Sequence, residues 1–360
     1  MKLTVSGLIF AFFVVVVGGI WFVWNGFVNS PASTTSLEVV YEVRPGQTLT
    51  KVANDLEAQG LIKKTKLFLL LARLNGQQNS MKVGEYALNQ NMKPTEVLDI
   101  ITSGKSIGRN FTVAEGLNLF EIADIFGRVE TTKKQEFWDL VNDPEFASQL
   151  VGERVRNLEG YLFPETYQIT KYTDTKSVIR AMVARFLDVY RRDVEPLAQS
   201  SGMTRNQVVT LASIIEKETG APEERPTISS VFHNRLRKGM MLQTDPTVLY
   251  GKARLLGRME ISITRNDLRM PTEYNTYVIR GLPPGPIASP GRAALQAAVQ
   301  PAATDYLFFV SQNDGTHIFS KTYEDHRKGV EKFQIDRKAR DGRSWRELKN
   351  NRPGENLQGR

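Results

Sequence analysis

The amino terminus constrains this chain more than any other stretch, because Leu3 to Trp24 is 22 residues long and carries no charge. As a helix it would span about 33 Å at ~1.5 Å per residue, which is enough to cross the hydrocarbon core of a bilayer. Only the amino terminus and Lys2 precede it, so the positive-inside rule keeps that end in the cytoplasm. We expect residues 1–28 to form a single-pass anchor in the cytoplasmic (inner) membrane, with the folded part on the periplasmic, extracytoplasmic side. A cleaved signal peptide is the alternative, and it would export the folded part equally.

The composition excludes several classes of site. The 360 residues include no cysteine, so disulfides and thiolate metal sites are absent. The three histidines, His233, His317 and His326, lack metal-ligand spacing. We therefore expect no metal and no cofactor.

The net charge of +8 does not indicate nucleic-acid binding. Residues 337–360 hold eight Lys/Arg against three Asp/Glu, which places most of the excess in one short segment. The basic residues therefore do not form an aromatic-studded face within the folded part. We expect residues 336–360 to be a basic, disordered tail.

A repeat organises the region after the anchor. Residues 29–38 are small and polar and are predicted to be a flexible linker. The segment YEVRPGQTLTKVANDL, from Tyr41, aligns with FTVAEGLNLFEIADIF, from Phe111, as a strand, a glycine turn and a helix. The first copy resembles LysM modules, which bind glycans that contain N-acetylglucosamine; a spacer or scaffold is the alternative. We predict a LysM-like module over 39–107 and a catalytic domain over 108–335 that holds the second copy at 111–126.

The segment LASIIEKETG, Leu211 to Gly220, carries the strongest signal of chemistry. An apolar helical pattern runs into Glu216 and Glu218 and stops at Gly220. A carboxyl group against an apolar wall has a raised pKa and can act as a general acid near neutral pH. Exposed glutamates on a last helical turn are the alternative. The two glutamates lie about 200° apart around a helix, so they cannot form a catalytic pair, and Glu216 is expected to pair with Arg235 or Arg237.

Other segments predict local structure or a sugar site. The segment LEGYLFPETY, Leu158 to Tyr167, mixes aromatic rings with carboxylates, so we expect either a sugar site or a domain core there. The segment MLQTDPTVLYG, Met241 to Gly251, is predicted to be extended with a turn at Pro246. The segment Pro271 to Pro286 is dense in Tyr, Asn, Pro and Gly, which is typical of a functional loop. Tyr306 to Val310 is predicted to form a hairpin with Thr316 to Phe319.

Together these motifs resemble the YceG-like (MltG) family of membrane-anchored endolytic murein transglycosylases. The resemblance runs from the anchor to about Ile335 and includes SVFHNRLRKGMMLQTDPTVLYG and PTEYNTYVIRGLPPGPIASPG. It implies a lyase that cuts the β-1,4 bond between N-acetylmuramic acid and N-acetylglucosamine within peptidoglycan strands and leaves 1,6-anhydro ends. It places the catalytic acid on Glu218. Glu218-Thr219 resembles the Glu-Ser motif of lysozyme-like lytic transglycosylases, and Tyr274-Asn275 resembles their Tyr-Asn motif. Gln243 resembles a glutamine that lines their cleft.

The resemblance therefore predicts an α+β fold: a transmembrane helix, a small LysM-like α/β module and a larger mixed α/β domain with lysozyme-like cleft motifs. Most glycosidases use two carboxylates, but one acid suffices if the substrate itself supplies the nucleophile. Partners would include cell-wall elongation machinery but no nucleic acid. Competing hypotheses are an anchored non-catalytic glycan-binding protein and a water-using hydrolase with Asp245 or Glu216 as base. The expected substrate contacts are Thr219, Gln243, Asp245, Tyr274, Asn275 and Tyr277, with a turn cap as the alternative role of Asp245.

Overall fold

The computed structural model describes residues 5–199, 201–260 and 262–336, and the chain divides into two compact units. The first unit comprises Met1–Asn110 and Gln168–Thr173, and the second comprises Phe111–Tyr167 and Asp174–Arg360. The divisions fall within β3 (Arg109–Thr112) and β4 (Thr166–Ile169), which pair as a two-stranded sheet. The tail predicted over 336–360 lies, apart from Asp336, outside the described residues.

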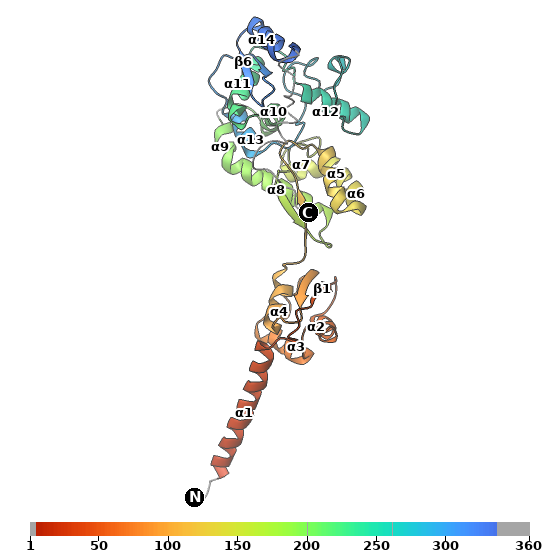
Figure 1. Ribbon diagram of the computed structural model, residues 1–360, viewed down its shortest axis with the longest axis vertical. Helices are drawn as coiled ribbons and strands as arrows, with labels where there is room; N and C mark the ends of the chain where they lie inside the picture. The colour runs from red at the N-terminus through yellow and green to blue at the C-terminus, as the bar shows by residue number, and fades with distance from the viewer. Residues whose placement is uncertain (1–4, 200, 261, 337–360) are drawn as a thin grey trace. The chain divides into compact units, whose positions relative to one another are not determined.

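The first unit, drawn in red and orange in Figure 1, is built from a long helix, two paired strands and three short helices. Its elements are α1 (Val5–Asn29), β1 (Glu38–Val43), α2 (Leu49–Ala58), α3 (Thr65–Leu74), β2 (Gly84–Asn89) and α4 (Pro94–Ser103).

Helix α1 is the one helix among the described residues that is long and apolar enough to cross a membrane, by its stretch Phe12–Asn29. Its large apolar side chains, such as Phe12, Val15 and Phe22, are exposed. A soluble helix would bury such a surface, so α1 fits a membrane anchor or a signal sequence. The predicted N-terminal apolar helix is confirmed.

The carboxyl end of α1 packs into the first unit. Phe27 is only 4% exposed and belongs to the unit's hydrophobic core, and Trp24 and Val28 pack against that core. The following segment is also bound, because the backbone N–H of Ser33 donates to the carbonyl oxygen of Gln90 at 3.0 Å. The segment predicted as a flexible linker is thus held against the end of β2.

The core of the first unit lies between its strands and helices. Strands β1 and β2 are antiparallel and place Tyr41 opposite Tyr86, with both rings buried. Leu56 of α2, Phe68 of α3 and Leu98 of α4 fill the same core. This unit therefore has a hydrophobic core of its own.

Both copies of the repeat fold as a strand, a turn and a helix. Gly46 and Gly116 have φ of 78° and 79°, a left-handed conformation that favours glycine in each turn. Thr48 and Asn118 then cap α2 and α5 by accepting a hydrogen bond from a backbone N–H in the first turn. The shared sequence pattern therefore specifies the same local structure in each unit.

The second unit is mostly helical, with one hairpin. Its elements are α5 (Leu119–Val129), α6 (Lys134–Asn142), α7 (Pro144–Val151), α8 (Thr175–Asp193), α9 (Glu195–Ala198), α10 (Arg205–Glu218), α11 (Arg225–Arg237), α12 (Asp245–Leu256), α13 (Arg292–Val299), β5 (Phe308–Ser311), β6 (His317–Ser320) and α14 (Tyr323–Val330), which continues as a π turn over Glu331–Ile335. The predicted hairpin and the mixed α/β architecture are confirmed.

Helix α10 is the centre of the second unit. It starts at a capping box, in which the side chains of Thr204 and Gln207 each bond the other's backbone N–H. Every residue from Val208 to Ile215 is buried, and the helix packs against α11, α12 and α13 (Figure 1). A helix that is buried on all sides holds its last residue in a defined position.

The prediction of a turn at Pro246 is wrong. Asp245 and Pro246 open α12 instead, and the preceding residue, Thr244, is its N-cap. Proline is favoured in the first turn of a helix, where its missing N–H is not needed, and an aspartate there interacts favourably with the helix dipole. An Asp-Pro pair can therefore begin either a turn or a helix, and only the packing of α12 decides between them.

The first six residues of the segment LEGYLFPETY, Leu158 to Phe163, belong to the core. Tyr161 and Phe163 are buried, and Glu159 is 1% exposed. The Glu159 carboxylate accepts a hydrogen bond from the backbone N–H of Leu119 at 3.0 Å, at the start of α5. Burial raises the pKa of Glu159 to about 7.

The raised pKa of Glu159 predicts how stability depends on pH. The folded state keeps this proton up to about pH 7, whereas the unfolded state loses it near the ordinary pKa of 4.5. The free energy of unfolding should therefore fall by about 3 kcal/mol as the pH rises through this window and stay level above it. In Glu159→Gln this fall should disappear, as measured by denaturant unfolding at several pH values. An exposed control, Glu223→Gln, should keep it, and an unchanged slope in Glu159→Gln would contradict the prediction.

Candidate active site

Glu218, the last residue of α10, lines a cavity of about 450 Å³ in the second unit. The cavity draws residues from α10, α11, the start of α12, the loop before α13, the β5 strand and α14. Its lining residues are Glu218, Arg235, Leu242, Gln243, Asp245, Tyr277, Phe308, Phe309, Tyr323 and His326.

The surroundings of Glu218 favour its protonated form. Burial raises the pKa of this carboxyl group, and the nearby charge of Asp245 raises it further. The hydroxyl of Thr244 donates a hydrogen bond to Glu218 Oε1, and this bond, with weaker contributions from His317 and Arg235, opposes the rise. The net direction is upward, as a general acid requires.

Glu216 lies outside this cavity and is neutralised elsewhere. Its Oε1 accepts from Arg225 at 3.1 Å, and its Oε2 accepts from the backbone N–H of Gly291 at 3.0 Å. The predicted pairing of Glu216 with Arg235 or Arg237 is therefore wrong. The two glutamates point to different neighbours because they lie two residues apart on one helix.

Arg235 shapes the wall of the cavity. Its Nε donates to the carbonyl oxygen of Leu307 at 2.6 Å, and its Nη1 donates to that of Leu242 at 2.7 Å. The guanidinium lies 5.2 Å from the centroid of the Phe308 ring. This arginine connects α11 to the segment before α12 and to the hairpin, so it holds three parts of the cavity together.

Three of the predicted substrate contacts meet at the cavity: Gln243, Asp245 and Tyr277. Gln243 has φ of 50°, a left-handed conformation that is uncommon outside glycine, and its N–H donates to Thr276 O at 3.1 Å. Such strained residues cluster at functional sites. The hydroxyl of Tyr277 donates to Asp245 Oδ1 at 2.7 Å, which fixes both side chains at the cavity mouth.

The structure does not bring Tyr274, Asn275 or Thr219 to the cavity lining. Tyr274 is buried against Tyr250, and the Asn275 amide donates to the carbonyl oxygens of Asp267, Leu268 and Met270. Asn275 Oδ1 also accepts from the Tyr277 N–H at 2.9 Å, so it positions that tyrosine. The hydroxyl of Thr219 donates to the carbonyl oxygen of Ile215 at 2.7 Å, within its own helix.

Sequence reasoning missed the contribution of the carboxyl-terminal hairpin and of α14. Phe308, Tyr323 and His326 line the cavity, and the His326 ring stacks on Phe308 with centroids 5.2 Å apart. Burial and the charge of Arg235 lower the pKa of His326, which favours its neutral form. The spacing of Tyr323 and His326, three apart on a helix, was the one available signal, since both fall on one face.

The hairpin turn also touches the end of α10. A Cβ atom on Gly220 would lie 2.3 Å from the carbonyl oxygen of Gly315, in the turn between β5 and β6. Two backbones therefore approach each other too closely for any side chain at this position. This contact places the hairpin beside Glu218.

The substitution Gly220→Ala should displace the hairpin from α10. We expect a loss of about 1–3 kcal/mol in stability, because the new methyl group meets backbone atoms rather than a flexible side chain. Thermal melting of the full chain in detergent measures it. Gly285→Ala is the matched control, since its Cβ would meet only Tyr274 Oη at 3.6 Å, and it should melt like the wild type. Equal melting of both variants would contradict the assigned contact.

The arrangement provides a carboxyl group with a raised pKa, an arginine in the wall, amide and hydroxyl groups, and aromatic rings around a cavity. Within residues 5–199, 201–260 and 262–336, no three His, Asp or Glu side chains gather as metal ligands would. This set of groups suits acid–base chemistry on a polar substrate with apolar faces.

Known proteins are similar to this chain in sequence and in fold. Residues 41–332 match the YceG-like family. The chain is 31% identical over 336 residues to the endolytic murein transglycosylase of Bacillus subtilis, covering 88% of this chain and 91% of that protein. It is 30% identical to the endolytic murein transglycosylase of Streptococcus pneumoniae, of which it spans 58%. The crystal structure of a yceG-like protein from Listeria monocytogenes aligns with 82% of this chain and 99% of its own, at 32% identity and a TM-score of 0.55.

Proposed function

The chain belongs to the YceG-like family, and on that basis we propose that it is an endolytic transglycosylase of peptidoglycan. It cleaves the β-1,4 bond between N-acetylmuramic acid and N-acetylglucosamine within nascent strands, leaves 1,6-anhydro-muramic ends and so terminates strand elongation. The observation that carries this proposal is Glu218, a single carboxyl group with a raised pKa at the end of a buried helix, within a cavity. The reaction is formally that of a lyase.

In the first step, protonated Glu218 donates its proton to the glycosidic oxygen. The bond between this oxygen and muramic C1 breaks, and the pair of electrons leaves with the oxygen. The 2-acetamido oxygen of the same sugar supports the positive charge that develops at C1. No second carboxylate is required, which agrees with Glu216 being paired to Arg225 outside the cavity.

In the second step, Glu218 acts as a base. Its carboxylate takes the proton of the C6 hydroxyl while that oxygen bonds to C1, and Glu218 is again protonated. No water is consumed, so the products differ from the substrate only by the transfer within the muramic sugar. The hydroxyl of Thr244 stabilises the carboxylate form between the two steps.

The cavity residues supply substrate contacts in this proposal. Gln243 holds the acetamido group, since an amide both donates and accepts hydrogen bonds. Tyr277 stacks on or bonds a sugar, with Asp245 orienting its hydroxyl at 2.7 Å. Tyr274 and Asn275 support the loop that presents Tyr277, and Thr219 ends the helix behind Glu218. The cavity is in this reading a lysozyme-like cleft.

The first unit serves anchoring and substrate capture. We propose that α1 crosses the cytoplasmic membrane once with its amino terminus inside, and that the protein works beside the cell-wall elongation machinery. The module that follows is LysM-like and binds glycan.

Hydrogen–deuterium exchange of the full chain with a chitin oligosaccharide tests glycan binding by this module. Protection over residues 38–103 supports glycan binding, and no protection makes the module a spacer.

Substitution of the acid gives the main test. Full-length wild type and Glu218→Gln, in detergent, are incubated with purified peptidoglycan strands, and the released ends are read by mass spectrometry. The wild type should give internal cuts with anhydro-muramic ends, one water lighter than hydrolytic ends. Glu218→Gln should cut about 10²–10⁴-fold more slowly, because it cannot donate the proton. The exposed neighbour Glu223, changed to Gln, is the matched control and should retain activity.

Other outcomes would assign other functions. Reducing ends from the wild type would indicate a hydrolase that uses water, and Asp245→Asn would then test the base. Strands that bind equally to wild type and Glu218→Gln, with no cleavage by either, would indicate an anchored glycan-binding protein.

Thr244→Val keeps the shape of the side chain but removes the hydrogen bond to Glu218. Because this bond lowers the pKa of Glu218, its loss should raise that pKa and move the high-pH limit of activity to higher pH. The maximal rate should fall about 10-fold, since the carboxylate form loses a charge-assisted bond. The pH profile of cleavage measures both effects. A larger shift in Thr219→Val than in Thr244→Val would assign the orienting hydroxyl to Thr219 instead.

A further inference from the structure

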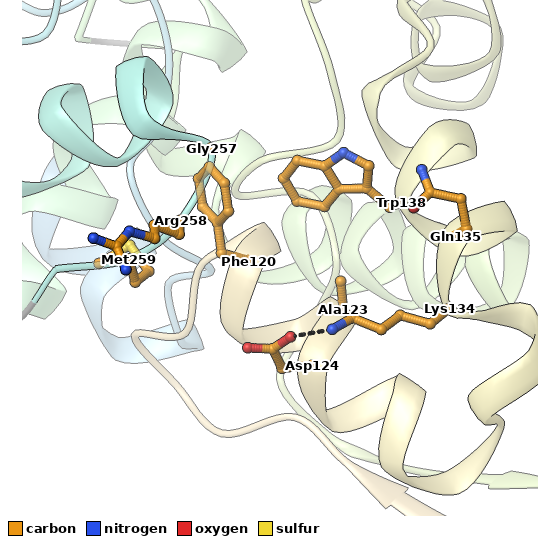
Figure 2. A pocket seen from close by; sticks show the side chains of 9 residues that line it. All are labelled: Phe120, Ala123, Asp124, Lys134, Gln135, Trp138, Gly257, Arg258 and Met259. Atoms are coloured by element: carbon orange, nitrogen blue, oxygen red, sulfur yellow. Dashed lines mark hydrogen bonds and ion pairs between the residues drawn. The ribbon is translucent and has the colours of Figure 1, made fainter.

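A second cavity, of about 340 Å³, lies in the second unit apart from Glu218 (Figure 2). It is formed by the start of α5, by α6 and by the residues that end α12, and none of its residues lines the first cavity. The lining residues are Phe120, Ala123, Asp124, Lys134, Gln135, Trp138, Gly257, Arg258 and Met259.

Two aromatic rings form one wall of this cavity. Trp138 is half-buried and Phe120 is buried, with their centroids 4.8 Å apart and their planes at 41°. The indole N–H of Trp138 is a hydrogen-bond donor at the edge of its ring. The wall therefore offers a ligand an apolar ring with a donor at its edge.

Polar groups of both charges surround the rings. Lys134 Nζ pairs with Asp124 Oδ1 at 2.6 Å across the cavity, as Figure 2 shows, and both side chains are exposed to solvent. Arg258 is 76% exposed and pairs with Glu260 at 3.0 Å, and Gln135 adds an amide. A ring face beside donors and acceptors matches a pyranose, which has apolar C–H faces and hydroxyl groups at its edges. The mixed charge does not suit a polyanion.

Helix α12 connects the two cavities. Asp245, its first residue, lines the cavity of Glu218, and Gly257, its C-cap, lines the second cavity. The 12 residues of α12 separate these ends by about 18 Å at ~1.5 Å per residue. Arg254 also donates to Asn142 Oδ1 at 3.0 Å, which ties the end of α12 to the helix that carries Trp138. The two cavities are therefore held at a defined separation.

We propose that the second cavity is an accessory saccharide site, which binds a segment of the glycan strand away from the bond that is cut. This inference rests on the proposed function, because it takes the polymeric substrate of that reaction as its ligand. A strand that reaches both cavities binds more tightly than a fragment that fills only one. The site thereby favours long strands and cuts within them.

The test measures equilibrium binding by full-length protein in detergent. Glu218→Gln serves as the background, and uncrosslinked glycan strands of a long and a short size class are the probes. Adding Trp138→Ala should weaken binding of the long strands about 3- to 10-fold and leave the short fragments unchanged. Trp138→Phe, which keeps a ring, should restore most of the affinity. Arg258→Ala, at the exposed rim, should weaken long-strand binding without a change in melting temperature.

Two results would overturn the accessory site. One is equal long-strand affinity with and without Trp138. The other is an equal loss for long and short strands together with a lower melting temperature, which would make Trp138 a packing residue. The proposed reaction is tested separately, by identifying the strand ends that the wild type releases. An enzyme that releases no anhydro ends overturns the proposed reaction, while the binding titration still decides the accessory site.

Discussion

The proposed chemistry depends on the desolvation of one carboxyl group at the end of a helix that is buried on all sides. Helix α10 places eight consecutive residues, Val208 to Ile215, in the core, so the position of Glu218 is set by the packing of three neighbouring helices. The same burial removes water from the carboxyl group and raises its pKa. Burial therefore sets the position of Glu218 and makes the largest contribution to its raised pKa, and the charge of Asp245 adds to that rise.

Three carboxylates near the end of α10 differ in what neutralises them. Glu216 is paired with Arg225, and Asp245 accepts a bond from Tyr277 at the cavity mouth. Glu218 makes no ion pair with a described residue and receives instead a neutral hydroxyl from Thr244. A neutral donor stabilises the carboxylate less than a cation would, so the group can both release and regain a proton. This difference separates a structural acid, Glu216, from the acid that we propose to react, Glu218.

The sequence predicts what depends on local pattern, and it fails where distant segments meet. The end of α10 and the hairpin follow from apolar spacing and turn residues, and the repeat follows from its two glycines. Pro246 was misjudged because Asp-Pro begins a helix as readily as a turn, and only the packing of α12 decides. Arg235 and His326 could not be assigned to the cavity, since each acquires its role by contact with residues more than ten positions away. Glu216 instead pairs with a nearer residue, Arg225, because the turn after α10 brings the first residue of α11 back to it.

The burial of Phe27 has a mechanical consequence for the first unit. A helix in a bilayer adjusts to a change in hydrocarbon thickness by tilting. With Phe27 inside the core and Ser33 bonded to Gln90, there is no swivel between α1 and the strands that follow. If α1 crosses the membrane as proposed, a tilt of α1 would therefore rotate the whole first unit with it, and lipid thickness would become a variable that sets the orientation of this unit.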